Sequence, residues 1–207
     1  SLGVNDISIN SLDPNIVLAA CDYGLFRSID GGNNWTQAYS QACWDIELRP
    51  ANANIVYLLK SNPVAKRCEF FRSEDRGITF TLQDTGWYNS TDAARTDDGA
   101  RMTVTPADTG KIYCVLLGNS KAGDMNYIGV YRSDDGGSHW INPRGQDGGP
   151  YSNSVYNLAT IDETSGFEQG YYNLSLAASH TDPNTIFVGC LSMSKSIIER
   201  FGGRICF

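Results

Sequence analysis

Short runs of alternating polar and apolar residues recur along the chain, separated by turn-forming residues. Residues 6–10 alternate polar and apolar positions, Asp13-Pro14-Asn15 is typical of a turn, and an apolar run follows over residues 16–20. Strict alternation indicates a half-buried strand, and a short apolar run between turn signals is consistent with a buried one. The pattern therefore predicts two antiparallel strands joined by a turn at the start of the chain.

The same order of strands and turns is expected three more times. Strands are expected at 44–49, 55–59, 70–72 and 79–82, then at 101–105, 112–117, 129–132 and 139–142, and last at 172–177 and 186–190. Repeated four-stranded units of this size are typical of propeller blades. The pattern predicts an all-β chain forming one partial β-propeller domain over residues 1–207, with about four blades of four antiparallel strands at approximately 5–40, 44–83, 100–142 and 172–198.

One motif, Ser-x-Asp-x-Gly-x-x-aromatic, follows the third strand of the first three repeats. Its residues are Ser28, Asp30, Gly32 and Trp35; Ser73, Asp75, Gly77 and Phe80; and Ser133, Asp135, Gly137 and Trp140. By composition, one match is expected in only about a few chains per thousand of this length. Three matches in one chain therefore indicate a structural repeat with the same tight hairpin in each copy.

The residue types of the motif suit a hairpin. Glycine tolerates the positive φ that tight turns require, while the Asp carboxylate and the Ser hydroxyl can bond to loose backbone N–H groups. The aromatic ring is expected to fold over the hairpin. In the second copy Arg76 replaces a glycine, so we expect one strained position fewer there. The fourth repeat has no motif after Lys195-Ser196 and is expected to be either degenerate or truncated.

A metal-binding or catalytic role for the motif aspartates is the alternative hypothesis. The spacing of a calcium loop is absent from all three copies. Only His139 and His180 are present, and no Cys-x-x-Cys occurs, so the sequence predicts no metal, no cofactor and no catalytic residue that can be assigned by position. The motif is interpreted as structural.

The composition of the chain limits the classes of binding partner that are expected. The net charge of −7 and the lack of a basic cluster make nucleic acid a poor partner, and no apolar run is long enough for a membrane span. There are six cysteines. Cys21 and Cys190 occupy equivalent repeat positions and are expected to be buried thiols, whereas a bridge between Cys43 and Cys68 is left open. The chain begins without Met or a signal-like segment, which we interpret as a mature product or a fragment.

The motif resembles the Asp-box, also called the BNR repeat, of bacterial sialidases, of the sortilin N-terminal region, of a photosystem assembly factor and of xyloglucan-active glycoside hydrolases. The Asp-Pro-Asn turns also resemble those of large secreted repeat proteins of bacteria. The resemblance implies a propeller whose boxes lie on outer hairpins away from the ligand-binding face, and a secreted or cell-surface location. Because those families use more blades, the remaining blades of a longer chain are an expected partner.

Function is expected on the rim opposite the boxes, where the longer connections at 60–69, 84–99, 118–127 and 143–170 gather. The candidate residues of this ligand face are Trp87, Tyr88, Asp98, Arg101, Asp124, Tyr127 and Tyr151. Aromatic rings can stack on sugars or hold a peptide, and carboxylates can form an acid/base pair. The sequence favours a non-catalytic binding or scaffold module for a protein or a carbohydrate. The alternative is part of a glycoside hydrolase, xyloglucanase-like before sialidase.

Overall fold

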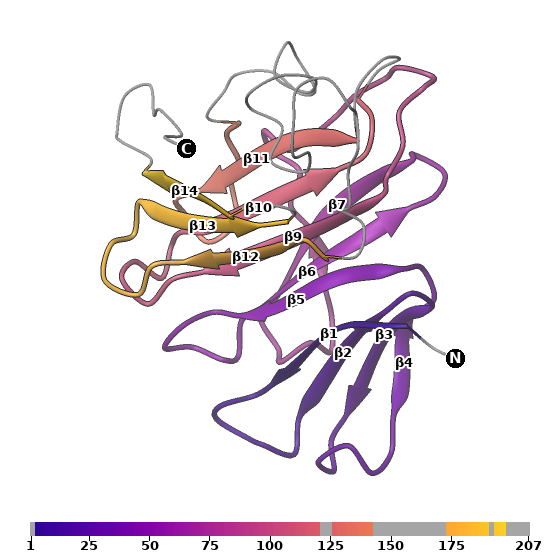
Figure 1. The fold of residues 1–207 in the computed structure, drawn as a ribbon. Helices are drawn as coiled ribbons and strands as arrows, with labels where there is room; N and C mark the ends of the chain where they lie inside the picture. Colours follow the sequence, from indigo (N-terminus) through magenta and orange to yellow (C-terminus); the bar gives the residue numbers. More distant parts are fainter. Residues whose placement is uncertain (1–2, 121–125, 143–172, 191–192, 198–207) are drawn as a thin grey trace.

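The computed structural model describes residues 3–120, 126–142, 173–190 and 193–197. Within these residues the chain forms fourteen strands in four antiparallel sheets, each in simple sequential order (Figure 1). Sheet 1 contains β1 (Val4–Ile9), β2 (Val17–Cys21), β3 (Gly24–Ser28) and β4 (Thr36–Tyr39). Sheet 2 contains β5 (Cys43–Leu48), β6 (Val56–Asn62), β7 (Arg67–Ser73) and β8 (Thr81–Leu82).

The next two sheets have three strands each in the described part of the chain. Sheet 3 contains β9 (Gly99–Val104), β10 (Ile112–Leu117) and β11 (Tyr127–Ser133). Sheet 4 contains β12 (Ser175–Ala178), β13 (Thr185–Gly189) and β14 (Met193–Ile197).

The fourth strand expected at 139–142 is reduced to a single bridge between Arg132 and Ile141. The amide of Trp140 donates to the carbonyl of Thr85 in the connection from sheet 2, so this segment pairs there instead.

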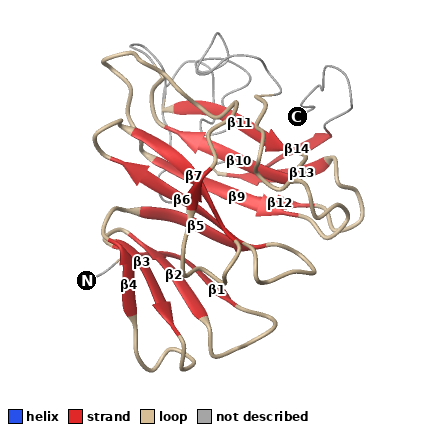
Figure 2. Ribbon diagram, turned by 180° about the vertical axis from the view of Figure 1, so that it is seen from behind, coloured by secondary structure: helices blue, strands red, loops and turns tan. Residues whose placement is uncertain are grey.

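The sheets are arranged so that their first strands lie beside one another. Strand β1 contacts β5, β5 contacts β9, and β9 contacts β12, while the other strands of each sheet extend outward (Figures 1 and 2). The strand register is shared between repeats, because Val17, Val56 and Ile112 each pair with the serine of their own motif. This common register defines equivalent positions in the first three sheets.

Three apolar layers hold the sheets together. Between sheets 1 and 2, Leu18, Ala20 and Leu25 face Ile46, Val56 and Leu58. Between sheets 2 and 3, aromatic rings dominate the layer, and between sheets 3 and 4 smaller aliphatic residues do. Because alternate residues of a strand point to opposite faces, each middle sheet contributes one set of side chains to each of two layers. Removal of this apolar surface from water is the main favourable term for such packing.

The cysteines follow the same division between faces. Cys43 belongs to the layer between sheets 1 and 2, and Cys68 to the layer between sheets 2 and 3, so the bridge considered from sequence does not form. Side chains directed to opposite faces of one sheet cannot meet disulfide geometry. Cys21 is a buried free thiol, as expected, whereas Cys190 is half-buried and donates to Asn173 Oδ1 at 3.2 Å.

Candidate functional site

The first hairpin, residues 28–35, is closed by its own side chains. The Oγ of Ser28 donates to Asp30 Oδ1 at 2.8 Å and accepts from the Gly32 amide at 2.9 Å. Asp30 Oδ1 also accepts from the Asn34 amide at 2.8 Å, and Asp30 Oδ2 from the Asn34 side chain at 2.6 Å. These bonds from Asn34, together with Ser28, lower the pKa of Asp30 to about 2. The carboxylate is therefore fully engaged within eight residues of chain.

The second hairpin, residues 73–80, repeats the arrangement. Ser73 Oγ donates to Asp75 Oδ1 at 2.7 Å and accepts from the Gly77 amide at 2.9 Å. Asp75 accepts from the amide of Thr79 at 2.9 Å and from its hydroxyl at 2.6 Å. Desolvation opposes ionisation here, but these hydrogen bonds outweigh it and lower the pKa of Asp75 to about 2.

The third hairpin, residues 133–140, has the same bonds. Ser133 donates to Asp135 at 2.9 Å, and the amide of His139 donates to the same carboxylate at 2.9 Å. The His139 ring lies against the second oxygen at 2.5 Å. Desolvation raises the pKa of Asp135, yet the bonds from His139 and Ser133 leave it below its usual value. His139 occupies the position of Asn34 and Thr79 in the other hairpins, and its ring contacts the second carboxylate oxygen as their side chains do. This contact gives the position of His139 a structural explanation.

Arg76 does not relieve the second hairpin of a strained residue, as the sequence suggested. Arg76 has a φ of +61°, close to the +70° of Gly31 and of Gly136 at the equivalent positions. A non-glycine residue in this region costs free energy. In return, Arg76 Nε donates to Asn54 Oδ1 at 2.7 Å, which ties the hairpin to the turn between β5 and β6.

The first three hairpins are linked by the arginines that precede the motif serines of sheets 1 and 2. Arg27 Nε donates to the carbonyl of Arg76 at 3.2 Å, and Arg72 Nη1 to the carbonyl of Gly136 at 3.4 Å. Both contacts run from one sheet to the equivalent carbonyl of the next. The motif therefore fixes the spacing between sheets as well as the shape of each turn.

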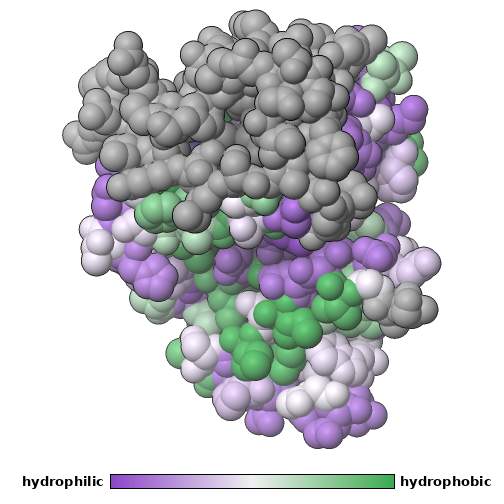
Figure 3. Space-filling view, viewed as in Figure 1, coloured by the Kyte–Doolittle hydropathy of each residue, from purple (hydrophilic) through white to green (hydrophobic). Residues whose placement is uncertain are grey.

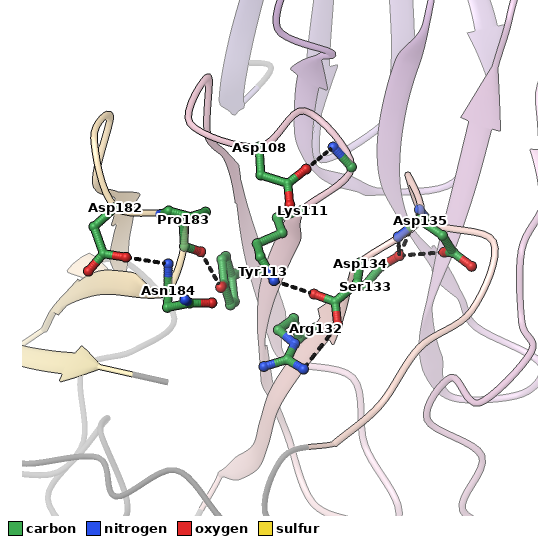
Figure 4. Close-up of polar contacts among 12 residues, drawn as sticks. Asp108, Lys111, Tyr113, Arg132, Ser133, Asp134, Asp135, Asp182, Pro183 and Asn184 are labelled. Carbon is green, nitrogen blue, oxygen red and sulfur yellow. Dashed lines mark hydrogen bonds and ion pairs between the residues drawn. The ribbon is translucent and has the colours of Figure 1, made fainter. Parts of the chain in front are cut away.

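The polar contacts between sheets 3 and 4 differ from those between the earlier sheets (Figure 4), and the sequence after β14 contains no copy of the motif. Asp134 holds both Lys111 at 2.6 Å and Arg132 at 3.0 Å within sheet 3. The hydroxyl of Tyr113 donates to the carbonyl of Pro183 at 2.6 Å, in the turn before β13. A tyrosine thus makes the link that arginine makes elsewhere.

Carboxylates on the first strands form a second set of repeated contacts, which the sequence interpretation missed. Asp6 Oδ2 accepts from the Ile46 amide at 3.3 Å, and Asp45 Oδ2 from the Met102 amide at 2.6 Å. Asp6 and Asp45 are equivalent in register, since they pair with Ala20 and Leu59. When the second strands of the repeats are aligned in the sequence, Asp6 and Asp45 fall at the same distance before them. This coincidence is the signal that could have identified the pair.

Burial changes the ionisation of these inner carboxyls. Desolvation, with the neighbouring charge of Asp6, raises the pKa of Glu47 to about 7. Desolvation also raises the pKa of Asp45, against the bond from the Met102 amide, and Asp6 adds to the rise. Asp97 lies two residues before β9. Desolvation raises the pKa of Asp97 to about 6, although the side chains of Ser61 and Trp44 donate hydrogen bonds to its carboxylate. Carboxyls that titrate near neutrality are candidates for acid/base chemistry, although structural networks shift pKa values as well.

The structure places the predicted ligand-face residues in three settings. Trp87, Tyr88 and Tyr127, three of the candidate residues of the ligand face, are buried in the structure. The Trp87 ring packs among Phe70, Tyr131 and Trp140, and its Nε1 donates to the Cys68 carbonyl at 2.9 Å. Trp87 and Tyr88 belong to the connection after β8, and their rings fill space in the layer between sheets 2 and 3. Burial of their large apolar surface explains this position.

The remaining candidates are only partly accessible or lie outside the description. Asp98 is half-buried and accepts from Thr96 at 2.7 Å. Arg101 is half-buried, and its Nη1 donates to the carbonyl of Trp44 at 2.5 Å. Asp124 and Tyr151 lie outside the described residues.

Two connections on the rim opposite the hairpins are joined to each other. The structure shortens the first connection, expected at 60–69, to a turn at 63–66 between β6 and β7. We call this turn, with Arg67 at the start of β7, and residues 84–98 the loop rim. Arg95 Nε donates to the Ala65 carbonyl at 2.7 Å, and Arg67 Nη1 to Asn89 Oδ1 at 2.8 Å. Val64 stands at the tip with 89% of its surface exposed. A short turn and a long connection are thus joined into one surface.

Two grooves lie between successive hairpins on the other rim. The first, of about 500 Å³, is lined by residues that include Ile29, Asn34 and Ile78, and the second, of about 460 Å³, by residues that include Arg72, Thr79 and Ser138. Among the described residues, no group of three or more His, Cys, Asp or Glu side chains could hold a metal ion. Within the same residues, no helix is long and apolar enough to cross a bilayer.

No protein family model matches the chain, and no curated protein matches it. Solved structures do resemble it. A GH74 xyloglucanase from Xanthomonas campestris is 20% identical over 95% of this chain and 30% of its own, with a TM-score of 0.62. An ancestral GH74 enzyme is 15% identical over 99% of this chain and 32% of its own, with a TM-score of 0.59. An auxiliary nutrient binding protein from Bacteroides thetaiotaomicron is 14% identical over 97% of this chain and 46% of its own, with a TM-score of 0.56.

These similarities concern the fold alone, because all three identities are low. The chain spans about a third of the length of the two GH74 proteins and just under half of the nutrient binding protein. Sequentially ordered antiparallel sheets with adjacent first strands, together with these structural neighbours, identify the described chain as an all-β, partial β-propeller.

Proposed function

We propose that the chain is part of a secreted or cell-surface Asp-box propeller that acts as a non-catalytic binding or scaffold module for a protein or a glycan. The observation that carries this proposal is the loop rim. Arg67 and Arg95 join the turn between β6 and β7 to the connection that leads from sheet 2 to sheet 3. Val64 and the acidic Asp92 are exposed on that surface. Rigidly displayed loops are the usual position of binding residues.

The engaged state of the hairpin carboxylates supports a non-catalytic role for the motif. Asp30 and Asp75 accept hydrogen bonds from their own hairpins and have pKa values of about 2, so they are permanently ionised near neutral pH. A general acid needs a proton to give, and its optimal pKa lies near the working pH. These carboxylates suit a structural role, and the resemblance to Asp-box repeats agrees with it.

The cysteines are compatible with a location outside the cytoplasm. Desolvation raises the pKa of Cys43 to about 12 and raises that of Cys68 and of Cys114. Only the thiolate reacts in disulfide exchange, so buried protonated thiols persist without oxidation. Localisation itself rests on the resemblance to secreted repeat proteins.

Calorimetric titration with xyloglucan oligosaccharides and with sialyllactose, combined with an assay for newly formed reducing ends, tests the proposal. We expect a ligand to bind without release of reducing ends, and the variants Val64→Ser and Asp92→Ala to weaken binding at least tenfold. Ile29→Ser, which changes an exposed apolar residue on the hairpin rim, is the matched control. Loss of binding in the control, with binding retained in the loop-rim variants, would contradict the position of the site.

The second candidate function is part of a glycoside hydrolase. The inner carboxyls favour it, because Glu47 and Asp97 have pKa values of about 7 and 6, and two similar structures are GH74 proteins, one of them a xyloglucanase. Glycosidases use a pair of carboxyl groups of which one is protonated. Hydrolysis of xyloglucan that disappears in Asp97→Asn or in Glu47→Gln, in variants that remain folded, would establish this alternative in place of the binding module.

A further inference from the structure

The two grooves of the hairpin rim are built from equivalent positions of successive repeats. Each is lined by the arginine that precedes the motif serine, by the motif aspartate and by a threonine of the fourth strand. The first groove has Ile29, Ala38 and Ile78 where the second has Glu74, Gln83 and Ser138. Two equivalent sites on one scaffold therefore differ in chemistry, and the first is the more apolar.

Two exposed isoleucines flank the first groove. Ile29 follows the motif serine and is 68% exposed, and Ile78 follows the motif glycine of the next hairpin and is 63% exposed. The other hairpins have polar residues at these two places, namely Glu74 and Asp134 at the first and Asn33 and Ser138 at the second. The bonds that close the hairpin are the same in all three copies, so the fold requires no apolar residue at either place. Exposed apolar side chains gathered at one groove mark an interaction surface.

The arginine of the first groove lacks the ion pair that its equivalents form. Arg72 pairs with Glu74, two positions further on, at 2.8 Å, and the arginine before the third hairpin pairs with an aspartate at 3.0 Å. Arg27 has Ile29 two positions further on and forms no ion pair with the described residues. Its Nε donates to the carbonyl of Arg76, and both Nη groups of this half-buried guanidinium remain for a ligand. A carboxylate is the group that best completes such a contact.

The aspartate of the first groove is already engaged. Asp30 accepts hydrogen bonds from the Ser28 hydroxyl and from the amide and the side chain of Asn34. The lining of the first groove also has one negative charge fewer than that of the second, because Ile29 stands in place of Glu74. The first groove is therefore better suited than the second to a ligand that carries a carboxylate.

The edge strand β4 favours a peptide as this ligand. Within the described residues β4 pairs with β3 alone and forms the outer edge of sheet 1 (Figure 2). Thr36 and Ala38 of this strand line the groove. An extended peptide can add a strand to such an edge, where backbone hydrogen bonds give affinity and alternate side chains give specificity.

We propose that the first groove binds an extended segment of a partner protein that is both acidic and apolar. A carboxylate of the segment meets Arg27, its apolar side chains cover Ile29 and Ile78, and its backbone pairs along β4. The volume of about 500 Å³ is within the range of sites that bind small ligands. The groove lies on the rim opposite the loop rim, so this inference adds a second binding surface and does not rest on the proposed function.

The groove is separate from the exposed apolar face on the other side of sheet 1. Ile7 and Ile9 are exposed on that face, and Figure 3 shows hydrophobic residues gathered over the part of the molecule where Figure 1 draws sheet 1. Arg27 pairs with Leu18, which packs against sheet 2, whereas Ile7 pairs with Ala19 on the opposite face. Substitutions in the groove therefore leave that face unchanged.

Fluorescence anisotropy with labelled pentapeptides and the full-length polypeptide tests the inference. The peptides carry Val, Leu, Ile or Phe at the first and fifth positions, Asp or Glu at the third and Thr between them, so that the apolar and acidic side chains share one face of a strand. We expect peptides of this set to bind, and binding to weaken about tenfold or more in Ile29→Glu and in Ile78→Ser.

Both variants introduce a residue that the second groove already contains at the same place, so folding is expected to persist. Val64→Ser, on the loop rim, is the control and is expected to leave peptide binding unchanged. As a second measurement, Glu74→Ile combined with Ser138→Ile gives the second groove the chemistry of the first and is expected to add a second bound peptide. An unchanged stoichiometry would contradict the role assigned to these positions.

Four results would overturn the inference. They are equal binding by the parent and both isoleucine variants, no binding by any peptide of the set, equal binding of peptides with Gln in place of the acidic residue, and binding of decanoate without binding of any peptide. The last result would identify a lipid chain as the occupant instead of a protein segment. Sugar binding at the loop rim is measured separately, so the two proposals can fail independently.

Discussion

The Nε of Arg27 donates to the backbone carbonyl of Arg76 at 3.2 Å, and this bond joins the hairpins of two successive sheets. Arg72 repeats it one sheet further on, with the carbonyl of Gly136. The repeat therefore encodes a contact between units as well as a turn within each unit. Since the acceptor is a backbone carbonyl, the contact is independent of the side chain at the accepting position.

Arg27→Met, which keeps the apolar stem and removes the donor, is expected to lower the free energy of unfolding by about 1 kcal/mol, the usual value of one intramolecular hydrogen bond. Urea unfolding followed by tryptophan fluorescence measures it. Glu74→Gln removes an exposed ion pair with Arg72 and is the control, with an expected change below about 0.5 kcal/mol. Equal changes in both variants would show that the contact between hairpins contributes nothing of its own.

Two neighbouring glycines of the third hairpin should differ in their tolerance of a side chain. A Cβ on Gly137 would lie 2.5 Å from Phe70 Cε1, whereas a Cβ on Gly136 would come no closer than 3.4 Å to Tyr57 Oη. Both have positive φ, so both alanine variants carry backbone strain of about 1 kcal/mol.

Gly137→Ala adds a steric clash in the core layer and is expected to cost about 2 kcal/mol more than Gly136→Ala. Thermal melts of the two variants against the parent chain provide the comparison. Tolerance at the equivalent of Gly136 is already visible in the chain itself, where Arg76 occupies that position. A larger loss for Gly136→Ala would contradict the packing described between the third hairpin and Phe70.

Much of the fold can be predicted from the sequence, because the strand, turn and hairpin signals all indicate the same repeated antiparallel sheet. Alternation predicts the strands, Asp-Pro-Asn predicts the turns, and the recurrence of Ser28, Asp30 and Gly32 at equivalent positions predicts the repeated hairpin. The structure shows those side chains bonded within their own hairpin, and such short-range contacts depend on a few neighbouring residues. Local chemistry of this kind can be interpreted without knowledge of the tertiary structure.

Contacts between sheets could not be predicted in the same way. Trp87 and Tyr88 stand in a connection with polar neighbours, and nothing in that segment shows that the layer between sheets 2 and 3 has space for large rings. The pKa shift of Glu47 likewise depends on burial against a neighbouring sheet, which periodicity along one strand does not reveal. Tertiary packing decided both.

Because of Glu47, the free energy of unfolding is expected to decrease as the pH rises towards neutrality. Desolvation raises the folded-state pKa of Glu47 to about 7 from its ordinary value of 4.5, so between these two pH values the folded state binds more protons than the unfolded state. Stability then falls as pH rises through this window, by roughly 1–3 kcal/mol for a shift of this size.

Guanidinium unfolding at pH 5 and at pH 8 measures the effect, and Glu47→Gln is expected to reduce the difference because the amide carries no titrating proton. Ser11→Glu, in the exposed turn between β1 and β2, provides a control with an added carboxyl in water. An unchanged pH dependence in Glu47→Gln would contradict the desolvation of this half-buried side chain.

The hairpin carboxylates should have the opposite effect from Glu47 on the pH dependence of stability, because their pKa values are lowered. The pKa of Asp75 is lowered to about 2, so its stabilisation is complete above pH 4 and is lost as the pH falls towards 2. Asp75→Asn cannot accept hydrogen bonds at both positions from Thr79 and Ser73, and is expected to cost about 1–3 kcal/mol at pH 7. Its neighbour Glu74, which is exposed, is changed to Gln as the control.

The free energy of unfolding of Asp75→Asn, measured at pH 7 alongside ligand binding or turnover by the same variant, tests the structural role of the repeated aspartates most directly. We predict a clear loss of stability together with unchanged binding in the protein that remains folded. Full stability together with abolished binding or turnover would contradict it, because the aspartate would then act on a ligand rather than on its own hairpin.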